Sequence, residues 1–251
     1  MEGQQPPPSS GEEPPYRLRV LSEPRGFLRI IEFFLAIFMF ATTAGFSDSM
    51  KYSVQCSIDP PINEEVPYSY PFKLYTYKYP SSYCTSGLTT PPRLNAATAE
   101  PEGSARFFVC IGVLAMLYCA VVLVWYVFLE VKFLHLEIVP LVDTMVTAVF
   151  SLLFFIASCA WAAGVGDVKW WTTFSNVRDR FYKETCMSDG VACVGNNGGY
   201  AGLNVSLIFG FLNCGVWAAN VWFTLKETGW FRANGSKARA TATRDIRKTH
   251  H

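Results

Sequence analysis

The chain has 251 residues, of which 51% are hydrophobic and 16% are charged, and its formal net charge at pH 7 is +1. A charge this close to zero gives no general argument for a nucleic-acid partner. The hydrophobic residues are gathered in four long blocks with very few charges. This pattern excludes an ordinary soluble globular domain and indicates an integral membrane protein.

The N-terminal segment, residues 1–25, is polar and rich in proline, so we expect a disordered tail rather than a cleaved signal peptide. The first hydrophobic block, residues 26–46, would then act as an uncleaved insertion signal. Arg29 and Glu32 lie in its first turns, three residues apart and therefore on one helical face. The favoured interpretation is an ion pair at the membrane interface, with Arg29 reaching the headgroups. The alternative is that Glu32 faces the bundle and fixes a neighbouring helix.

A long polar loop, residues 47–105, follows the first block and contains Cys56 and Cys84. Its tyrosine-rich middle, YSYPFKLYTYKY, alternates in a way that predicts one or two short strands. The second block covers residues 106–129 and the third covers residues 138–165. Because the connector between these blocks is too short for a domain, the two helices are predicted to form an antiparallel hairpin.

Asp143 lies near the start of the third block, just after Pro140. We interpret it as an acid of the first helical turn, favoured there by the helix dipole. A proton-carrying role is the alternative. It is disfavoured because no second acid lies in the centre of a block to exchange a proton with Asp143.

A second loop, residues 166–202, again carries two cysteines, Cys186 and Cys193. The last block, residues 203–225, has no charged side chain and is long enough, at about 1.5 Å per residue, to cross a hydrocarbon core of roughly 30 Å. Small residues and amides interrupt it, and such residues hold helices together inside lipid. The residues expected to pack against other helices or against partners are Glu32, Gly210, Asn213, Ala218 and Asn220.

The topology follows from the four blocks, because an even number of spans places both termini on one side of the membrane. The segment after the last block is basic, which favours a cytosolic location for both tails. The cysteines outside the blocks fall as one pair in each loop, and disulfides persist in the lumen or outside the cell. Pairing within each loop is the simplest connectivity, although others remain open. A zinc site is disfavoured, since the cysteines have neither CxxC spacing nor a nearby histidine.

The C-terminal tail, residues 226–251, suggests a contact with the anionic cytosolic leaflet. A solvated tail is an equally good interpretation, because no apolar face accompanies the charges. The residues proposed for membrane-surface contact are Lys237, Arg239, Arg244, Arg247 and Lys248. No catalytic constellation, phosphate-binding motif or metal-ligand spacing stands out, so neither an enzyme nor a cofactor or metal is expected.

Six segments carry a family resemblance. They are EPRGFLRIIEFFLAIFMFAT at residues 23–42, YPFKL at 70–74, SARFFV at 104–109, PLVDTMVTAVF at 140–150, SCAWAAGVGDVK at 158–169, and the closing stretch GLNVSLIFGFLN…W…N.WF..KETGW. Together they closely resemble the synaptophysin family, whose four-span architecture is of the MARVEL type. The resemblance implies an integral protein of synaptic or other small secretory vesicles, with both tails cytosolic and one disulfide in each lumenal loop. It also implies association with the vesicle fusion protein synaptobrevin, with cholesterol and with further copies of itself.

The chain departs from the neuronal members of that family in two places. Its C-terminal tail lacks their long Tyr/Gly/Pro/Gln-rich repeats, and its first loop lacks an N-glycosylation sequon. The sequons that do occur begin at Asn204, at the mouth of the fourth span, and at Asn234, in the cytosolic tail. We expect neither to carry a glycan.

The sequence therefore predicts an all-α membrane protein, a four-transmembrane-helix bundle with two disulfide-bearing lumenal loops. The predicted function is a non-enzymatic vesicle organiser that binds partner membrane proteins, cholesterol and anionic lipids, and no nucleic acid. An oligomeric channel or connexin-like pore is the alternative, and a claudin-type adhesion protein is a third class. Connexins carry three cysteines in each loop and claudins a W…GLW…C…C pattern in the first loop, and this chain has neither.

Overall fold

A computed structural model describes most of the 251-residue chain. The described residues are 24–57, 60–80, 83–84, 93–95, 100–128 and 138–227. Both predicted tails, except for a few residues next to the helices, and the connector between the second and third blocks lie outside these ranges. The proposed membrane-surface residues Lys237, Arg239, Arg244, Arg247 and Lys248 therefore lie outside the described residues.

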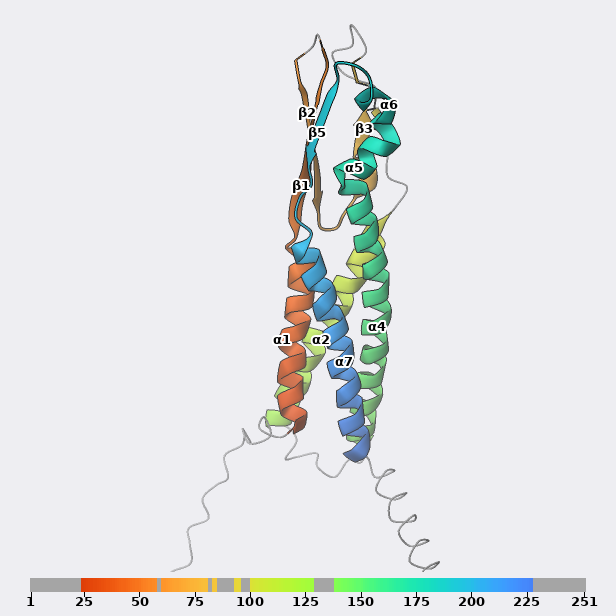
Figure 1. Cartoon of the computed structure of the whole chain (residues 1–251). Helices are drawn as coiled ribbons and strands as arrows, with labels where there is room; N and C mark the ends of the chain where they lie inside the picture. The colour runs from red at the N-terminus through yellow and green to blue at the C-terminus, as the bar shows by residue number, and fades with distance from the viewer. Residues whose placement is uncertain are drawn as a thin grey trace, which may run out of the picture.

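Four long helices run side by side and form one half of the molecule (Figure 1). They are α1 (Pro24–Ala44), α2 (Pro101–Phe128), α4 (Ile138–Thr172) and α7 (Ala201–Glu227). Each contains a stretch long and apolar enough to cross a membrane. Helices α1 and α4 each pack against both α2 and α7, so α1 and α4 face each other across a diagonal of the bundle. The outward faces carry exposed apolar side chains such as Phe38, Val121, Leu152 and Ile208, as contact with lipid requires.

Two helices are longer than their hydrophobic blocks. Helix α2 begins at Pro101 rather than residue 106, and α4 continues to Thr172 rather than ending at residue 165. At about 1.5 Å per residue, the 35 residues of α4 span about 52 Å, well beyond a hydrocarbon core of roughly 30 Å. Hydropathy marks the part of a helix that lies in lipid, whereas the helix itself continues into the part of the protein outside the membrane.

The two loops fold together at one end of the bundle. Strands β1 (Ser47–Gln55), β2 (Ile62–Ser69) and β5 (Ala192–Asn196) form an antiparallel sheet in the order β2-β1-β5. Strand β1 pairs with β2 of the same loop, whereas β5 comes from the second loop and pairs with the last five residues of β1. The sheet lies at the end of the bundle opposite the start of α1 and the end of α7 (Figure 1).

Short elements complete this extramembrane domain. They are the 3-10 helix η2 (Leu74–Thr76), the hairpin strands β3 (Lys78–Pro80) and β4 (Arg93–Asn95), helix α5 (Phe174–Val177), the π-helical turn η3 (Arg178–Tyr182) and helix α6 (Lys183–Cys186). The strand prediction for the tyrosine-rich segment is partly right, because the end of β2 and the start of β3 lie in it, but its middle turns into η2 instead of forming a strand. The predicted bundle with a disulfide in each loop is confirmed, and the loops add a sheet that an all-α description omits.

The interior of the extramembrane domain is aromatic. The hydroxyls of Tyr52 and Tyr83 lie 3.1 Å apart, and the ring of Tyr182 packs edge-on to Tyr83 with centroids separated by 4.8 Å. Phe174 stacks on Tyr52 at 5.6 Å. Burial raises the pKa of Tyr83 to about 12, and it raises the pKa values of Tyr52 and Tyr182 further. These phenols are therefore neutral hydrogen-bonding groups of a packed core.

Two disulfides tie this domain together. Cys56 at the end of β1 is bonded to Cys84, and Cys186 at the end of α6 is bonded to Cys193 in β5. Both bonds join cysteines of the same loop, so the simplest connectivity is confirmed.

Removing each disulfide should destabilise the domain by a different amount. The bonded cysteines are 28 residues apart in the first loop and 7 in the second. On the chain-entropy model the bonds stabilise by about 3.6 and about 2.4 kcal/mol, respectively. We expect the double variant C56S/C84S to lose more stability than C186S/C193S, measured by thermal unfolding and limited proteolysis in detergent. Cys110→Ser, at an exposed free cysteine of α2, is the control and should match the wild type. The reverse ranking would contradict the entropic account.

Candidate functional site

Arg29 lies at the centre of a cluster of polar side chains inside the four-helix bundle. Only 1% of its side chain is exposed. Its Nη1 atom donates to Glu32 Oε2 at 2.7 Å, and Nη2 donates to Asp143 Oδ1 at 2.7 Å. The guanidinium carbon also lies 5.2 Å from the ring centroids of Tyr118 and Trp217, within range of a cation–π interaction. The predicted ion pair between Arg29 and Glu32 is present, but the prediction that Arg29 reaches the headgroups is wrong, because its side chain faces the interior of the bundle.

Asp143 is the partner of Arg29 on the diagonally opposite helix α4. Its carboxylate accepts hydrogen bonds from two tyrosines of α2, at 2.5 Å from Tyr118 and 3.0 Å from Tyr126. Thr147, one turn further along α4, accepts from Arg29 Nη2 at 2.6 Å. The interpretation of Asp143 as an acid held mainly by the helix dipole is thus wrong. The side chain is a counter-ion in a charge-assisted contact between α1 and α4.

Glu32 is fully buried and links α1 to α7. Its Oε1 atom accepts from Asn220 Nδ2 at 2.8 Å, and the thiol of Cys119 lies 3.9 Å from Oε2. All four helices therefore contribute to one buried ion cluster. Its members are Arg29, Glu32, Tyr118, Cys119, Tyr126, Asp143, Thr147, Trp217 and Asn220.

The cluster lies near one end of the bundle. Arg29 and Asp143 each come five residues after the first residue of their helix, and Asn220 comes seven residues before the last residue of α7. At about 1.5 Å per residue, these positions are roughly 8–11 Å from the helix ends. This is the end opposite the disulfides (Figure 1), so the two most constrained regions of the molecule are at opposite ends.

Of the other residues of α7 that were expected to pack, two are buried and one is exposed. Asn213 is fully buried, and its Nδ2 atom donates to the Phe209 carbonyl at 2.8 Å with Met39 Sδ at 3.9 Å. Gly210 is buried where a Cβ atom would lie only 2.7 Å from the Phe108 ring. Ala218, however, is exposed on the outer face of α7. Its predicted place beside Asn213 and Asn220 is wrong, because it points away from the bundle.

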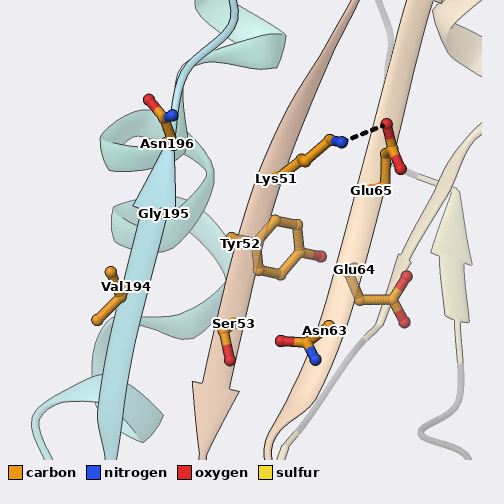
Figure 2. A pocket seen from close by; sticks show the side chains of 9 residues that line it. All are labelled: Lys51, Tyr52, Ser53, Asn63, Glu64, Glu65, Val194, Gly195 and Asn196. Atoms are coloured by element: carbon orange, nitrogen blue, oxygen red, sulfur yellow. Dashed lines mark ion pairs between the residues drawn. The ribbon is translucent and has the colours of Figure 1, made fainter.

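Outside the membrane, a hollow of about 460 Å³ lies against the three-stranded sheet (Figure 2). Its nine lining residues come from β1, β2 and β5 and include the ion pair between Lys51 Nζ and Glu65 Oε1, 3.4 Å apart. Both of these side chains are more than half exposed, so solvent screens the pair strongly. The lining contains neither histidine nor cysteine.

Metal-ligating side chains do not gather elsewhere in the part of the chain that the structure describes. Within it, no group of three or more His, Cys, Asp or Glu residues lies close enough together to hold a metal ion. The buried ion cluster is therefore the most distinctive arrangement of polar groups in the described residues.

A family model described as a membrane-associating domain, MARVEL, matches residues 20–223. This range covers more than half of the chain and includes α1, α2, α4, both disulfides and nearly all of α7. The chain belongs to the MARVEL family. Its four apolar helices are thus those of a membrane-associating domain, and the buried ion cluster lies inside the MARVEL bundle.

Five members of the cluster are not among the candidate residues of the sequence analysis. They are Tyr118, Cys119, Tyr126, Thr147 and Trp217. A tyrosine or threonine inside an otherwise apolar MARVEL span is a usable signal, because its hydroxyl needs a partner in hydrocarbon. Which residue supplies that partner depends on the arrangement of the helices in space.

Arg29→Met should destabilise the MARVEL bundle strongly. The substitution keeps the apolar stem but leaves the carboxylates without their cation, and breaking a buried pair typically costs about 3–5 kcal/mol. Arg106→Met is the matched control, because Arg106 is 56% exposed and pairs with Glu102 near the solvent. We expect a change of about 1 kcal/mol or less for the control. Denaturant titration in detergent, followed by tryptophan fluorescence, measures both, and equal losses would contradict a buried ion pair.

Proposed function

We propose that this MARVEL protein is a non-enzymatic, synaptophysin-like protein of synaptic or other small secretory vesicles. It organises the vesicle membrane and binds partner membrane proteins, synaptobrevin among them, during vesicle trafficking and exocytosis. Cholesterol, anionic lipids and further copies of the chain are its other expected partners. The family segments quoted from the sequence support the synaptophysin-like assignment within the larger MARVEL family.

The observation that carries this proposal is that the disulfides lie far from the two helix ends that lead to the N-terminal and C-terminal tails. Both disulfides belong to the extramembrane domain, at the end of the bundle opposite the start of α1 and the end of α7 (Figure 1). Disulfides persist in oxidising compartments such as the lumen of the secretory pathway. This supports a lumenal extramembrane domain and two cytosolic tails, as expected for a vesicle protein with four spans.

The burial of the polar groups supports an organiser over a pore formed within one chain. A water-filled path needs polar groups that water can reach. Arg29 and Glu32 are 1% and 0% exposed, and they bond to other side chains of the bundle. A pore between several copies is the second candidate function, and a flux measurement distinguishes it.

The outward face of α7 supports binding of a partner helix. Asn213 and Asn220 are occupied inside the bundle, so a partner helix would contact the opposite face. Gly215 and Ala218 are exposed there, and no atom lies within 4 Å of a Cβ built on Gly215. Small residues let a second backbone approach closely in lipid.

Co-purification and flux test the function directly. Tagged protein expressed with synaptobrevin should retain it in mild detergent, and liposomes containing the purified chain should pass ions no faster than empty liposomes. Gly215→Ile with Ala218→Ile should weaken synaptobrevin recovery by blocking close approach. Val149→Ile, at an exposed position of α4, is the matched control and should not. Ion flux above that of empty liposomes would favour the pore, and absence of synaptobrevin from the purified protein would reject the partner.

Glycosylation tests the topology independently. Asn204 lies in the first turn of α7, and its Oδ1 atom accepts a hydrogen bond from Lys169 Nζ at 2.7 Å. The transferase needs an accessible segment clear of the membrane, so we expect no mobility shift on glycosidase treatment of the wild type. Ala97→Ser creates the sequon Asn95-Ala-Ser in the first loop and should produce a shift, which the further change Asn95→Gln should abolish. A glycan at Asn234 would mean that the topology is inverted.

A further inference from the structure

The buried ion cluster contains one more acid than base. Glu32 and Asp143 are carboxylates, and Arg29 is the one cation in contact with them among the described residues. The other groups of the cluster are hydroxyls, a thiol, an indole and an amide. If both acids were ionised, the bundle would hold an uncompensated negative charge. An unpaired charge is very unfavourable in a hydrocarbon environment, where no water solvates it.

The strength of the donors distinguishes the two acids. Asp143 accepts from the guanidinium of Arg29 and from the hydroxyls of Tyr118 and Tyr126. An ionised carboxylate is an acceptor only, and a cation with two hydroxyl donors suits that form. Asp143 is therefore the better placed of the two acids to serve as the counter-ion of Arg29.

Glu32 has a different environment. Beyond Arg29 Nη1, its partners are the amide of Asn220, with Nδ2 2.8 Å from Oε1, and the thiol of Cys119, a weak donor 3.9 Å from Oε2. Asn220 is 1% exposed, and its Oδ1 atom has no hydrogen-bond partner among the described residues. An amide presents a donor and an acceptor, which a half-turn of its plane exchanges. After such a turn, the Oδ1 atom of Asn220 can accept a hydrogen bond from a protonated Glu32.

We propose that Glu32 and Asn220 form a proton-binding site inside the bundle, in which Glu32 carries an exchangeable proton on Oε1 and donates it to Asn220 Oδ1. The proton is taken from water and returned to water, and no other bond changes. With it, the cluster consists of the Arg29–Asp143 pair and a neutral acid. Without it, Glu32 competes with Asp143 for the guanidinium. This site is independent of the proposed vesicle function.

The titratable and charged groups around Glu32 come from every helix of the bundle. Arg29 on α1, Cys119 on α2 and the non-titrating Asn220 on α7 contact Glu32 directly. Asp143 on α4 shares Arg29 with it, and Tyr118 and Tyr126 on α2 donate to Asp143. Losing the proton would remove the hydrogen bond from Glu32 to Asn220 in the folded state and leave an uncompensated carboxylate inside the bundle. Stability therefore falls as the pH rises and the proton is lost.

Infrared difference spectroscopy of the full chain in nanodiscs tests the site. At neutral pH we expect the carbonyl band of a protonated carboxylic acid, which shifts when glutamate, but not aspartate, is labelled with carbon-13. The band should be absent in Glu32→Gln, which mimics the neutral acid and should fold as the wild type does. It should also vanish in Asp143→Asn, because Glu32 then becomes the counter-ion of Arg29. Absence of the band in the wild type, or a shift with labelled aspartate instead, would overturn the proposal.

Thermal unfolding across a pH series provides a second measurement. Between about pH 5 and about pH 9, the unfolding midpoint of the wild type should fall more than that of Glu32→Gln. Both proteins share the buried tyrosines of the extramembrane domain, so the difference between the two profiles isolates Glu32. Parallel profiles would count against the site, whatever the absolute stabilities.

Discussion

A guanidinium buried among apolar helices needs hydrogen-bond acceptors on several sides. In the MARVEL bundle, the contacts that meet this need constrain the relative positions of the helices more than any others. Arg29 obtains them from Glu32 on its own helix and from Asp143 and Thr147 across the diagonal. Leucine against leucine gains little over leucine against a lipid tail, so apolar packing alone specifies the relative positions of the helices weakly. The hydrogen bonds of Arg29 specify them strongly, because a shift of α1 or α4 along its axis would leave a charge unpaired.

The opposite end of the bundle is constrained by different means. Strand β1 continues directly from α1, and β5 precedes α7 by only a few residues, so the β1–β5 pairing holds the ends of α1 and α7 near each other. The Asp48 carboxylate reinforces this by accepting from the backbone N–H of Gly199 at 2.7 Å. Phe72 lies against Trp161 of α4, with ring centroids 5.2 Å apart, and this contact packs the first loop against the bundle. Disulfides, sheet pairing and aromatic packing hold this end of the molecule, whereas a buried ion cluster holds the other.

The sequence predicted where the helices lie along the chain. It predicted much less well which face of each helix points into the bundle. Long apolar blocks located the four helices, and the placement of cysteines gave the disulfides. Helical geometry at about 100° per residue could also have corrected Ala218, which lies two residues and so roughly 200° from Asn220. The spacing of Arg29 and Glu32, by contrast, places them on one face of α1 but does not show whether that face points into the bundle. The β1–β5 register could not be predicted either, because it joins residues some 140 positions apart; within β1, however, the alternation of Met50, Tyr52 and Val54 was a usable strand signal.

The distribution of polarity decides which surfaces remain for partners. The charges of the bundle satisfy one another in its interior, so a partner within the membrane contacts an outer surface that is almost wholly apolar. Recognition there depends on shape, which makes the places where side chains are small, such as Gly215 on α7, more informative than the places where they are large. The disulfide-bonded domain offers the other kind of surface, polar and open to water. Neither surface includes the buried ion cluster, so a contact made on the lipid-facing side or on the extramembrane domain need not disturb the charges that hold the bundle together.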